Sequence, residues 1–240
     1  MIFSVKSIAG KMGGSTMREL SSPVTSRQKE PHPRLAETVL KHAQHPWRKP
    51  VAQHSQDAFR ALTLEVERWP GSLILDTGCG TGQSTQHLAH QYPESLVLGV
   101  DKSVARLERH QGELPANAKL VRFDLEDFWI LAHQAGWRFA RQCFYYPNPW
   151  PKPEQRLRRW AFHPVLPTAL ACGGTWEVRS NWDIYAQEFA LAFGLLTGVT
   201  PQVESWHPRE PETLFEKKYQ DSGHELWRWV APTSSAPKQS

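Results

Sequence analysis

The ten-residue segment Leu73–Gly82, with the sequence LILDTGCGTG, constrains the fold of this chain more than any other. Its apolar run ends in Asp76 and predicts a buried strand of a parallel sheet. Gly78, Gly80 and Gly82 follow at alternate positions, and a helix-like run comes next. A strand, a glycine turn and a helix let backbone N–H groups approach a nucleotide-bearing ligand closely. The segment therefore predicts an α/β fold with such a site, and the alternative is a tight turn without a ligand.

Two acidic residues after the next strands support the ligand interpretation. The dinucleotide fingerprint G-x-G-x-x-G is incomplete here, because Gln83 occupies the place of its last glycine. Asp101 closes the next predicted strand, where a carboxylate can accept hydrogen bonds from ribose hydroxyls. Asp124 ends the strand after that. It can accept from an adenine amino group or cap the following helix, and both roles remain open.

Strands and helices alternate along the rest of the chain, which predicts a mostly parallel sheet with right-handed crossovers. No clear helix separates the last two predicted strands, so we expect them to form a hairpin with an antiparallel final strand. The predicted strands are 96–101, 119–124, 142–146, 174–180, 202–206 and 224–230. The predicted helices are 34–42, 56–69, 83–90, 104–110, 127–134, 154–162 and 185–196.

Length and composition fit one domain with polar ends. We expect a disordered tail at 1–32, a single domain at 33–231 and a polar tail at 232–240. No apolar run approaches the roughly 18 residues of a membrane span. The 28 basic and 24 acidic residues leave a formal charge of +4, which allows a polyanionic partner without requiring one. The three cysteines lie far apart, which predicts free thiols in a reducing cytoplasm and no metal site.

A proline-rich loop follows the predicted strand 142–146. Its sequence, YYPNPWPKP, alternates prolines and so fixes an extended backbone at the carboxyl end of that strand. Asn148 and Trp150 are therefore held near the expected ligand. Trp150 can stack on a base or pack into the protein, and we weigh these equally. The run Glu154–Arg159 that follows is rich in arginine, and RNA contact and a solvated helix face are both possible for it.

These motifs together resemble the bacterial tRNA (guanine-N7)-methyltransferases. The glycine turn is similar to motif I of class I S-adenosylmethionine-dependent methyltransferases, and the proline loop resembles the F-P-D-P-W-x-K of the tRNA enzymes. Two later segments, 178–185 and 213–216, resemble their T-D-W-x-x-Y and T-x-F-E motifs. The resemblance covers about residues 55–230.

The resemblance implies a fold, a reaction and a set of site residues. The fold would be a Rossmann-like seven-stranded sheet with helices on both faces. The reaction would transfer a methyl group from S-adenosyl-L-methionine to N7 of a tRNA guanosine, in the family guanosine 46 of the variable loop. The protein would be a cytoplasmic monomer or homodimer. Asn148 would be the catalytic residue. The cofactor would contact Asp76 through its amine, Gly78, Gly80, Gly82, Asp101 through its ribose, and Asp124. The tRNA would contact Lys152, Arg156, Arg158, Arg159, Asn181, Thr213, Phe215 and Glu216.

Two departures from the family pattern concern the acceptor. The family has aspartates at the places of Asn148 and Asn181, which we expect to face one base. Two charges are therefore absent from the predicted pocket. Alternatives to guanine-N7 methylation are a methyltransferase that acts on another nucleobase or an exocyclic amine, and an RNA-binding paralogue with weak catalysis.

Overall fold

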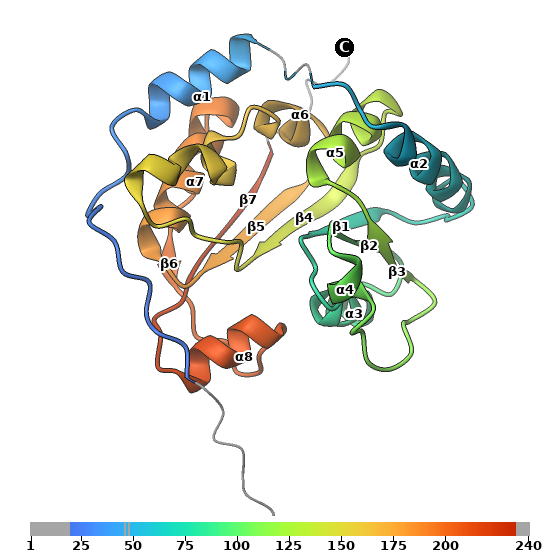
Figure 1. Ribbon diagram of the computed structural model, residues 1–240. Coiled ribbons are helices and arrows are strands. Elements are labelled where there is room, and N and C mark those ends of the chain that lie inside the picture. The colour runs from blue at the N-terminus through green and yellow to red at the C-terminus, as the bar shows by residue number, and fades with distance from the viewer. Residues whose placement is uncertain (1–19, 46, 48, 234–240) are drawn as a thin grey trace, which may run out of the picture.

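The computed structural model of the protein describes residues 20–45, 47 and 49–233. Its centre is a seven-stranded sheet in the order β3-β2-β1-β4-β5-β7-β6 (Figure 1). The first five strands run parallel, and β7 is antiparallel to both of its neighbours. The strands are β1 (Leu73–Thr77), β2 (Leu96–Asp101), β3 (Ala118–Arg122), β4 (Phe139–Tyr145), β5 (Thr175–Ser180), β6 (Glu204–Ser205) and β7 (Trp227–Pro232). The predicted α/β fold with an antiparallel final strand is confirmed.

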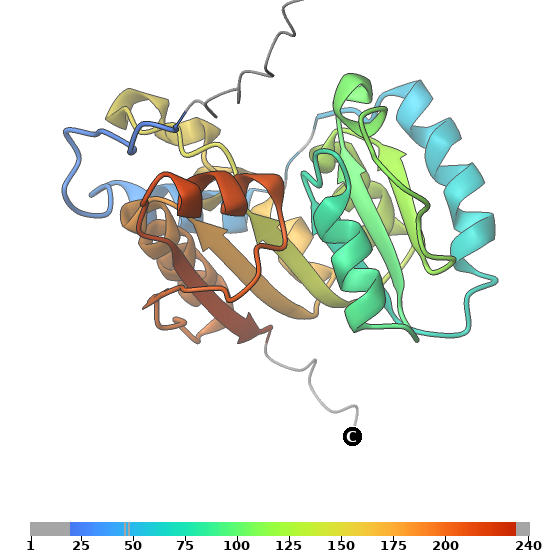
Figure 2. The ribbon, with the colours of Figure 1, turned by 90° about the horizontal axis from the view of Figure 1, so that it is seen from below.

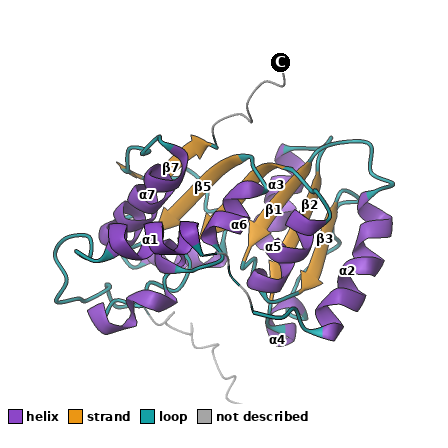
Figure 3. Cartoon of the chain, turned by 90° about the horizontal axis from the view of Figure 1, so that it is seen from above, coloured by secondary structure: helices purple, strands orange, loops and turns teal. Residues whose placement is uncertain are grey.

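Helices cover both faces of the sheet, as expected. In Figures 2 and 3, α3 and α8 lie on one face, and α1, α2, α5, α6 and α7 lie on the other. The helices are α1 (Leu35–Gln44), α2 (Gln53–Val66), α3 (Gln83–Gln91), α4 (Val104–Leu107), α5 (Leu125–Gln134), α6 (Leu166–Ala171), α7 (Asp183–Thr197) and α8 (Leu214–Asp221). Because β1 is covered on both sides, every residue in it is buried.

Alternation along β1 divides the core into two clusters. Leu73 and Leu75 belong to the large cluster under α1, α2, α5, α6 and α7, whereas Ile74 belongs to the smaller one under α3 and α8. Successive side chains of a strand point to opposite faces, so one apolar run supplies both clusters. Burial of this run on both faces fixes β1 at the centre of the molecule, and with it the glycine turn that follows.

Two local predictions are wrong. The helix α8 lies between β6 and β7, so these strands are not joined by a hairpin turn. The sequence of α8, LFEKKYQD, has no apolar stripe that would predict a helix. The residue that this helix buries fully is the charged Glu216. Second, the expected helix 154–162 is two 3-10 segments, Pro153–Arg158 and Trp160–Phe162, separated by the extended Arg159.

The described part of the predicted N-terminal tail, residues 20–32, is ordered against the domain. We call this segment the N-terminal strap; in Figure 1 it runs from α8 to the start of α1. Hydrogen bonds from Ser21, Ser26 and Gln28 attach it to three different elements. The expectation of disorder is therefore wrong here, because composition does not reveal these long-range anchors. The rest of that prediction, residues 1–19, and most of the C-terminal tail lie outside the described residues.

No helix in the described ranges combines the length and the apolar composition that crossing a membrane requires.

Candidate active site

The glycine turn after β1 leaves open space at two of its three glycines. Gly78, Gly80 and Gly82 all have positive φ, at 68°, 62° and 81°, which residues with a Cβ rarely adopt. A Cβ built on Gly78 or Gly80 would meet no atom within 4 Å, whereas one on Gly82 would collide with Leu120. The first two glycines therefore leave their backbone accessible to a ligand, and the third permits close packing of helix α3.

Asp101 connects the turn to the end of β2. Its Oδ2 accepts from the N–H of Gly80 at 3.0 Å, and its Oδ1 accepts from the N–H of Ser103 at 2.8 Å. The guanidinium of Arg106 lies 2.9 Å from the same Oδ1. The side chain is nearly buried but lines the pocket described below. Asp101 therefore holds the turn in place and also presents a carboxylate at the expected position.

Asp76 lies beneath the turn and does not line the pocket. Its Oδ2 accepts from the hydroxyls of Ser84 and Thr85, at 2.6 and 2.7 Å. Burial raises the pKa of this carboxyl to about 6 from 3.8, against the effect of the two hydroxyl groups. The predicted direct contact with a cofactor amine is not supported by this placement. The carboxylate instead ties β1 to the first turn of α3.

A pocket of about 490 Å³ lies at the carboxyl ends of β1, β2 and β4. This is the edge where parallel α/β sheets bind their ligands. Its lining residues are Thr77, Gly78, Asp101, Lys102, Arg106, Phe123, Asp124, Leu125, Glu126, Tyr145, Tyr146, Pro147, Asn148, Pro149, Trp160, Phe215 and Tyr219. The pocket therefore joins the glycine turn to the proline loop and to α8.

Asp124 lines this pocket without capping the helix that it precedes. It is the N-cap residue of α5, yet its side chain makes no capping hydrogen bond. A capping aspartate would accept from a backbone N–H in the first turn of the helix. Of the two roles left open by the sequence, the arrangement favours ligand contact.

The proline loop has a strained backbone. Tyr146 and Trp150 have φ of 53° and 44°, which is rare for residues with a large side chain. Each precedes a proline, and the fixed proline rings restrict the conformations open to both. Asn148 is exposed on the wall of the pocket, and its Oδ1 accepts from the N–H of Trp150 at 3.3 Å. The loop therefore presents the Asn148 amide from a constrained backbone, although Tyr146 and Trp150 are left-handed where the sequence predicted extended backbone.

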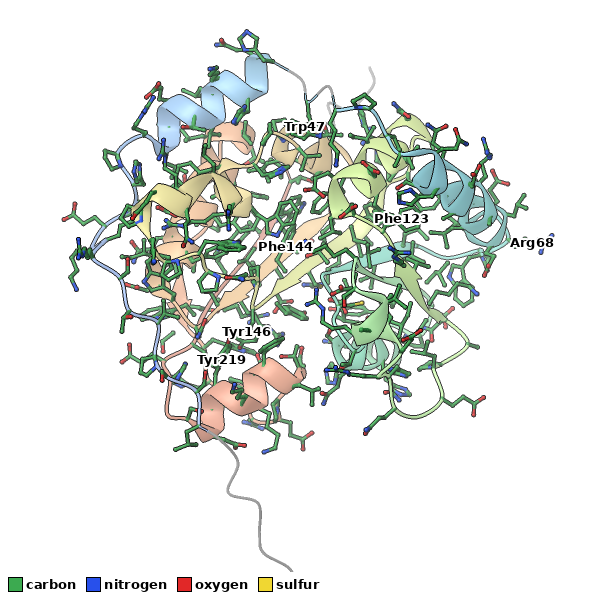
Figure 4. The ribbon with its side chains drawn as sticks, in the orientation of Figure 1. Trp47, Arg68, Phe123, Phe144, Tyr146 and Tyr219 are labelled. Carbon is green, nitrogen blue, oxygen red and sulfur yellow. The ribbon has the colours of Figure 1, made fainter. Side chains whose placement is uncertain are left out.

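Aromatic rings form the wall of the pocket opposite Asp101. Tyr219 lies 5.5 Å from Tyr146 and 6.0 Å from Phe215, measured between ring centroids, and stacks on His224 at 5.1 Å. Figure 4 shows Tyr146 and Tyr219 side by side, with Phe123 across the opening. Such faces suit a planar base. Phe215 was a predicted site residue. Tyr219, four residues later on the same helix, was missed because α8 was not recognised.

The side chain of Asn181 contacts His224. Its Nδ2 lies 3.3 Å from Nδ1 of His224, and Nε2 of that ring lies 2.9 Å from the carbonyl oxygen of Ser21. A neutral imidazole with its proton on Nε2 satisfies both contacts. Asn181 also does not line the pocket. The pocket wall therefore contains Asn148 without Asn181, whose side chain is directed to His224.

Two of the three predicted site residues at the start of α8 are structural. Thr213 caps the helix by accepting from the N–H of Glu216 at 2.9 Å. Glu216 is fully buried and accepts from the hydroxyl of Tyr146 at 2.6 Å, from Trp206 Nε1 at 3.0 Å and from Arg179 at 3.1 Å. These contacts use its carboxylate inside the protein, so it is not free to contact a base.

Arg179 is a buried cation that the sequence did not reveal. It pairs with Glu177 at 2.8 Å and with Glu212 at 2.8 Å, in addition to Glu216. Burial alone would lower the pKa of Arg179, but Tyr145 and these carboxylates raise it, and the rings of Tyr145 and Trp206 flank its guanidinium. The arginine therefore fixes α8 to β5 beneath the aromatic wall.

The basic segment after the proline loop divides into exposed and buried residues. Lys152 and Arg158 are exposed, and Arg158 lies over the ring of Trp150, 4.6 Å from its centroid. Arg156 is half-buried, and its Nε has no hydrogen-bond partner in the described residues. Arg159 has no exposed surface and pairs with Glu188 at 2.6 Å. The prediction that Arg159 contacts RNA is therefore wrong, whereas the other three cations remain accessible.

No group of three or more His, Cys, Asp or Glu side chains in the described ranges could hold a metal ion.

Sequence comparison finds relatives of known name. Several relatives carry the name tRNA (guanine-N(7)-)-methyltransferase, and three of them are described here. The protein from Treponema pallidum (strain Nichols) is 29% identical over 170 residues, which cover 66% of this chain and 67% of that one. The protein from Bordetella pertussis is 27% identical, covering 75% and 73%. The protein from Thermus thermophilus is 31% identical, covering 68% and 57%.

Solved structures and a family model give the fold and the family. The 16S rRNA methyltransferase KamB superposes with a TM-score of 0.54 at 15% identity, covering 77% of this chain and 95% of that one. An antibiotic-related methyltransferase superposes with a TM-score of 0.51 at 13% identity, covering 77% and 96%. These neighbours share the seven-stranded class I methyltransferase fold. The model of the family described as "Putative methyltransferase" matches residues 70–229, about two thirds of the chain, and the protein belongs to this methyltransferase family.

Proposed function

We propose that this protein transfers a methyl group from S-adenosyl-L-methionine to N7 of a guanosine in tRNA, at guanosine 46 of the variable loop. The observation that carries the proposal is the pocket that joins the glycine turn and Asp101 to Asn148 and the aromatic wall. The names of the relatives supply the acceptor. Because tRNA is the acceptor, we also propose a cytoplasmic location.

The residues around the glycine turn fit the cofactor. Open space in front of Gly78 and Gly80 allows the methionine moiety to approach the backbone. Asp101 offers a carboxylate to the ribose hydroxyls, and the uncapped Asp124 offers one to the adenine amino group. S-adenosylmethionine, when bound, supplies an electrophilic methyl group.

The proline loop and α8 fit the acceptor. A guanine ring can stack on the faces of Tyr219 and Phe215, while Tyr146 supports Tyr219 from behind. Asn148 lies on the adjoining wall, and its amide is oriented by the N–H of Trp150. The second lone pair of that amide oxygen can accept from N1–H or the amino group of guanine, a role that a carboxylate would also fill.

Guanine N7 carries a free lone pair, so this reaction requires no base to remove a proton before attack. The protein's contribution is to hold N7 in line with the methyl group, which orientation alone can accelerate greatly. Methylation leaves a positive charge on the purine. The dipole of the Asn148 amide stabilises that charge less than a carboxylate would.

Nucleoside analysis tests this proposal directly. We expect the purified protein to produce 7-methylguanosine in bulk tRNA from a strain that lacks this modification.

Asp101→Ala should weaken binding of S-adenosylhomocysteine by ~1–3 kcal/mol, because the ribose hydroxyls lose a charged acceptor. Calorimetry measures this loss, with Arg68→Ala, an exposed substitution at the far end of α2 (Figure 4), as the control. Methylation of an exocyclic amine in place of N7 would refute the assigned acceptor atom.

A further inference from the structure

The N-terminal strap crosses the acceptor side of the site and touches each element that forms it. At one end, the N–H of Ser21 donates to Ser222 at 2.9 Å, just beyond α8. In the middle, the hydroxyl of Ser26 donates to the carbonyl oxygen of Pro151 in the proline loop. At the other end, the N–H of His32 donates to Glu188 of α7 at 2.9 Å. The strap is therefore anchored to the elements that flank the acceptor side.

Arg159 fixes the strap and the proline loop relative to each other. Its guanidinium donates to the carbonyl oxygen of Trp150 at 3.0 and 3.1 Å and to the side-chain oxygen of Gln28 at 3.1 Å. Gln28 also donates to Glu188 at 2.7 Å, next to the Arg159–Glu188 ion pair. Neither charge has exposed surface, so breaking this arrangement would leave an unpaired buried charge. The spacing between strap and loop is thus set by a rigid polar cluster.

A groove of about 620 Å³ lies between the strap and the loop, lined by residues 25–27 and 151–154. Two cations in its wall, Arg27 and Lys152, are exposed, and neither has an ion-pair partner among the described residues. Arg158 adds a third cation beside Trp150, whereas Glu154 is the one acidic residue in the lining. Cations on both walls of one groove give it a positive face that suits an anionic ligand.

We infer that this groove binds the phosphodiester backbone of the RNA next to the target nucleotide, with Arg27 of the strap and Lys152 of the loop as its two phosphate contacts. The inference rests on the proposed function, because it takes RNA as the acceptor. Loop prolines keep one wall stiff, and Arg159 sets the distance to the other wall. The strap, which lies before the region matched by the family model, thereby becomes part of the acceptor site.

Salt dependence of tRNA binding tests the groove. Each lost phosphate contact should reduce the slope of log affinity against log salt by roughly 0.7–0.9. Arg27→Ala and Lys152→Ala should each show this change in binding to bulk tRNA, and the double variant about twice as much. Arg68→Ala is the matched control. It removes an exposed arginine at the far end of α2 (Figure 4) and should lower the slope by much less.

Binding of S-adenosylhomocysteine and thermal unfolding should stay at wild-type values, because both groove residues are exposed and lie outside the pocket. Wild-type slopes in both single variants, with methylation of tRNA intact, would overturn the groove and leave the proposed function standing. The groove proposal would also be overturned if Arg68→Ala reduced the salt slope as much as Arg27→Ala does. Failure of the wild-type protein to methylate tRNA would overturn the proposed function, and the inference with it.

Discussion

At the scale of single residues, Asn148 is the side chain on which the proposed chemistry depends most. It is exposed on the pocket wall, and the strained backbone on either side holds it there. Its amide can position guanine, but it brings no charge to oppose the positive product. Asn181, which the sequence paired with it, binds His224 instead. The two residues therefore act in different places, and only Asn148 is in a position to affect the acceptor directly.

Asn148→Asp should raise turnover on tRNA about ten-fold, equivalent to ~1.4 kcal/mol at the transition state. An aspartate can keep the hydrogen bond from the N–H of Trp150 while adding a negative charge near the methylated purine. Steady-state rates with nucleoside analysis measure the change. Asn181→Asp serves as the comparison, and its effect should add to that of Asn148→Asp, because the two side chains share no partner. Loss of all methylation in Asn148→Asp would contradict guanine N7 as the acceptor.

Asp76 is a buried carboxyl whose ionisation is opposed by its surroundings. Its raised pKa means that the folded protein holds the carboxyl proton more tightly than the unfolded chain does. Ionisation of Asp76 is therefore less favourable in the folded state than in the unfolded chain. The contribution of Asp76 to the free energy of unfolding is therefore fully present below pH 3.8 and is lost as the pH rises through 6.

Asp76→Asn should consequently gain stability over the wild type as the pH rises from about 4 to about 7.5. The pKa shift from 3.8 to about 6 corresponds to a change of ~2.4 kcal/mol, between these two pH values, in the difference between the two free energies of unfolding. Urea unfolding of both proteins at the two pH values measures it. The amide oxygen that this substitution introduces can still accept from Ser84 and Thr85. A difference that stays constant with pH would show that Asp76 does not titrate in this range.

At the scale of elements, the 3-10 segment after the proline loop assigns different roles to adjacent arginines. Extended backbone at Arg159 directs its side chain inward to Glu188, while Arg158 stays outside on the face of Trp150. A regular helix would have carried both residues on one basic surface, which was the expectation from the sequence. The interruption in the helix therefore converts one of the predicted RNA contacts into an internal brace.

Comparison of Arg158→Ala with Arg159→Ala should separate these roles. Arg159→Ala should cost ~3–5 kcal/mol of stability, because it leaves Glu188 charged and unpaired in the interior. Arg158→Ala should change stability by only about 0.5 kcal/mol while lowering the salt slope of tRNA binding by roughly 0.7–0.9. Denaturant unfolding and binding at several salt concentrations measure the two effects. Equal stability of both variants would rule out the brace.

Helix α8 shows a similar division. Its inner side is fixed by Glu216, which links Tyr146 and Trp206 to the buried Arg179. Its outer side presents Phe215 and Tyr219 to the pocket. A polar helix of eight residues has little intrinsic stability, so these tertiary contacts keep it folded. The buried network thus determines where the aromatic wall stands.

At the scale of the whole molecule, the pocket forms where two parts of one sheet meet. The glycine turn and Asp101, at the ends of β1 and β2, form the side of the pocket assigned to the cofactor. The proline loop, at the end of β4, forms the side assigned to the acceptor. The α8 segment and the strap, 201 residues apart at Ser21 and Ser222, come together through the hydrogen bond between those two serines. This hydrogen bond therefore joins the two ends of the domain beside the acceptor side.

The sequence alone determined the sheet, the antiparallel final strand and the positions of Gly78, Asp101 and Asn148. These follow from local patterns, since apolar runs, glycine turns and proline loops have the same meaning wherever they occur. Only the tertiary structure decided that Arg159 and Glu216 are internal, that Asn181 faces His224 and that the strap is ordered. Each depends on a polar partner that is distant along the chain, and polar side chains carry no periodic signal of such a partner. Hydrophobic burial could therefore be read from the sequence, whereas the pairing of buried charges could not.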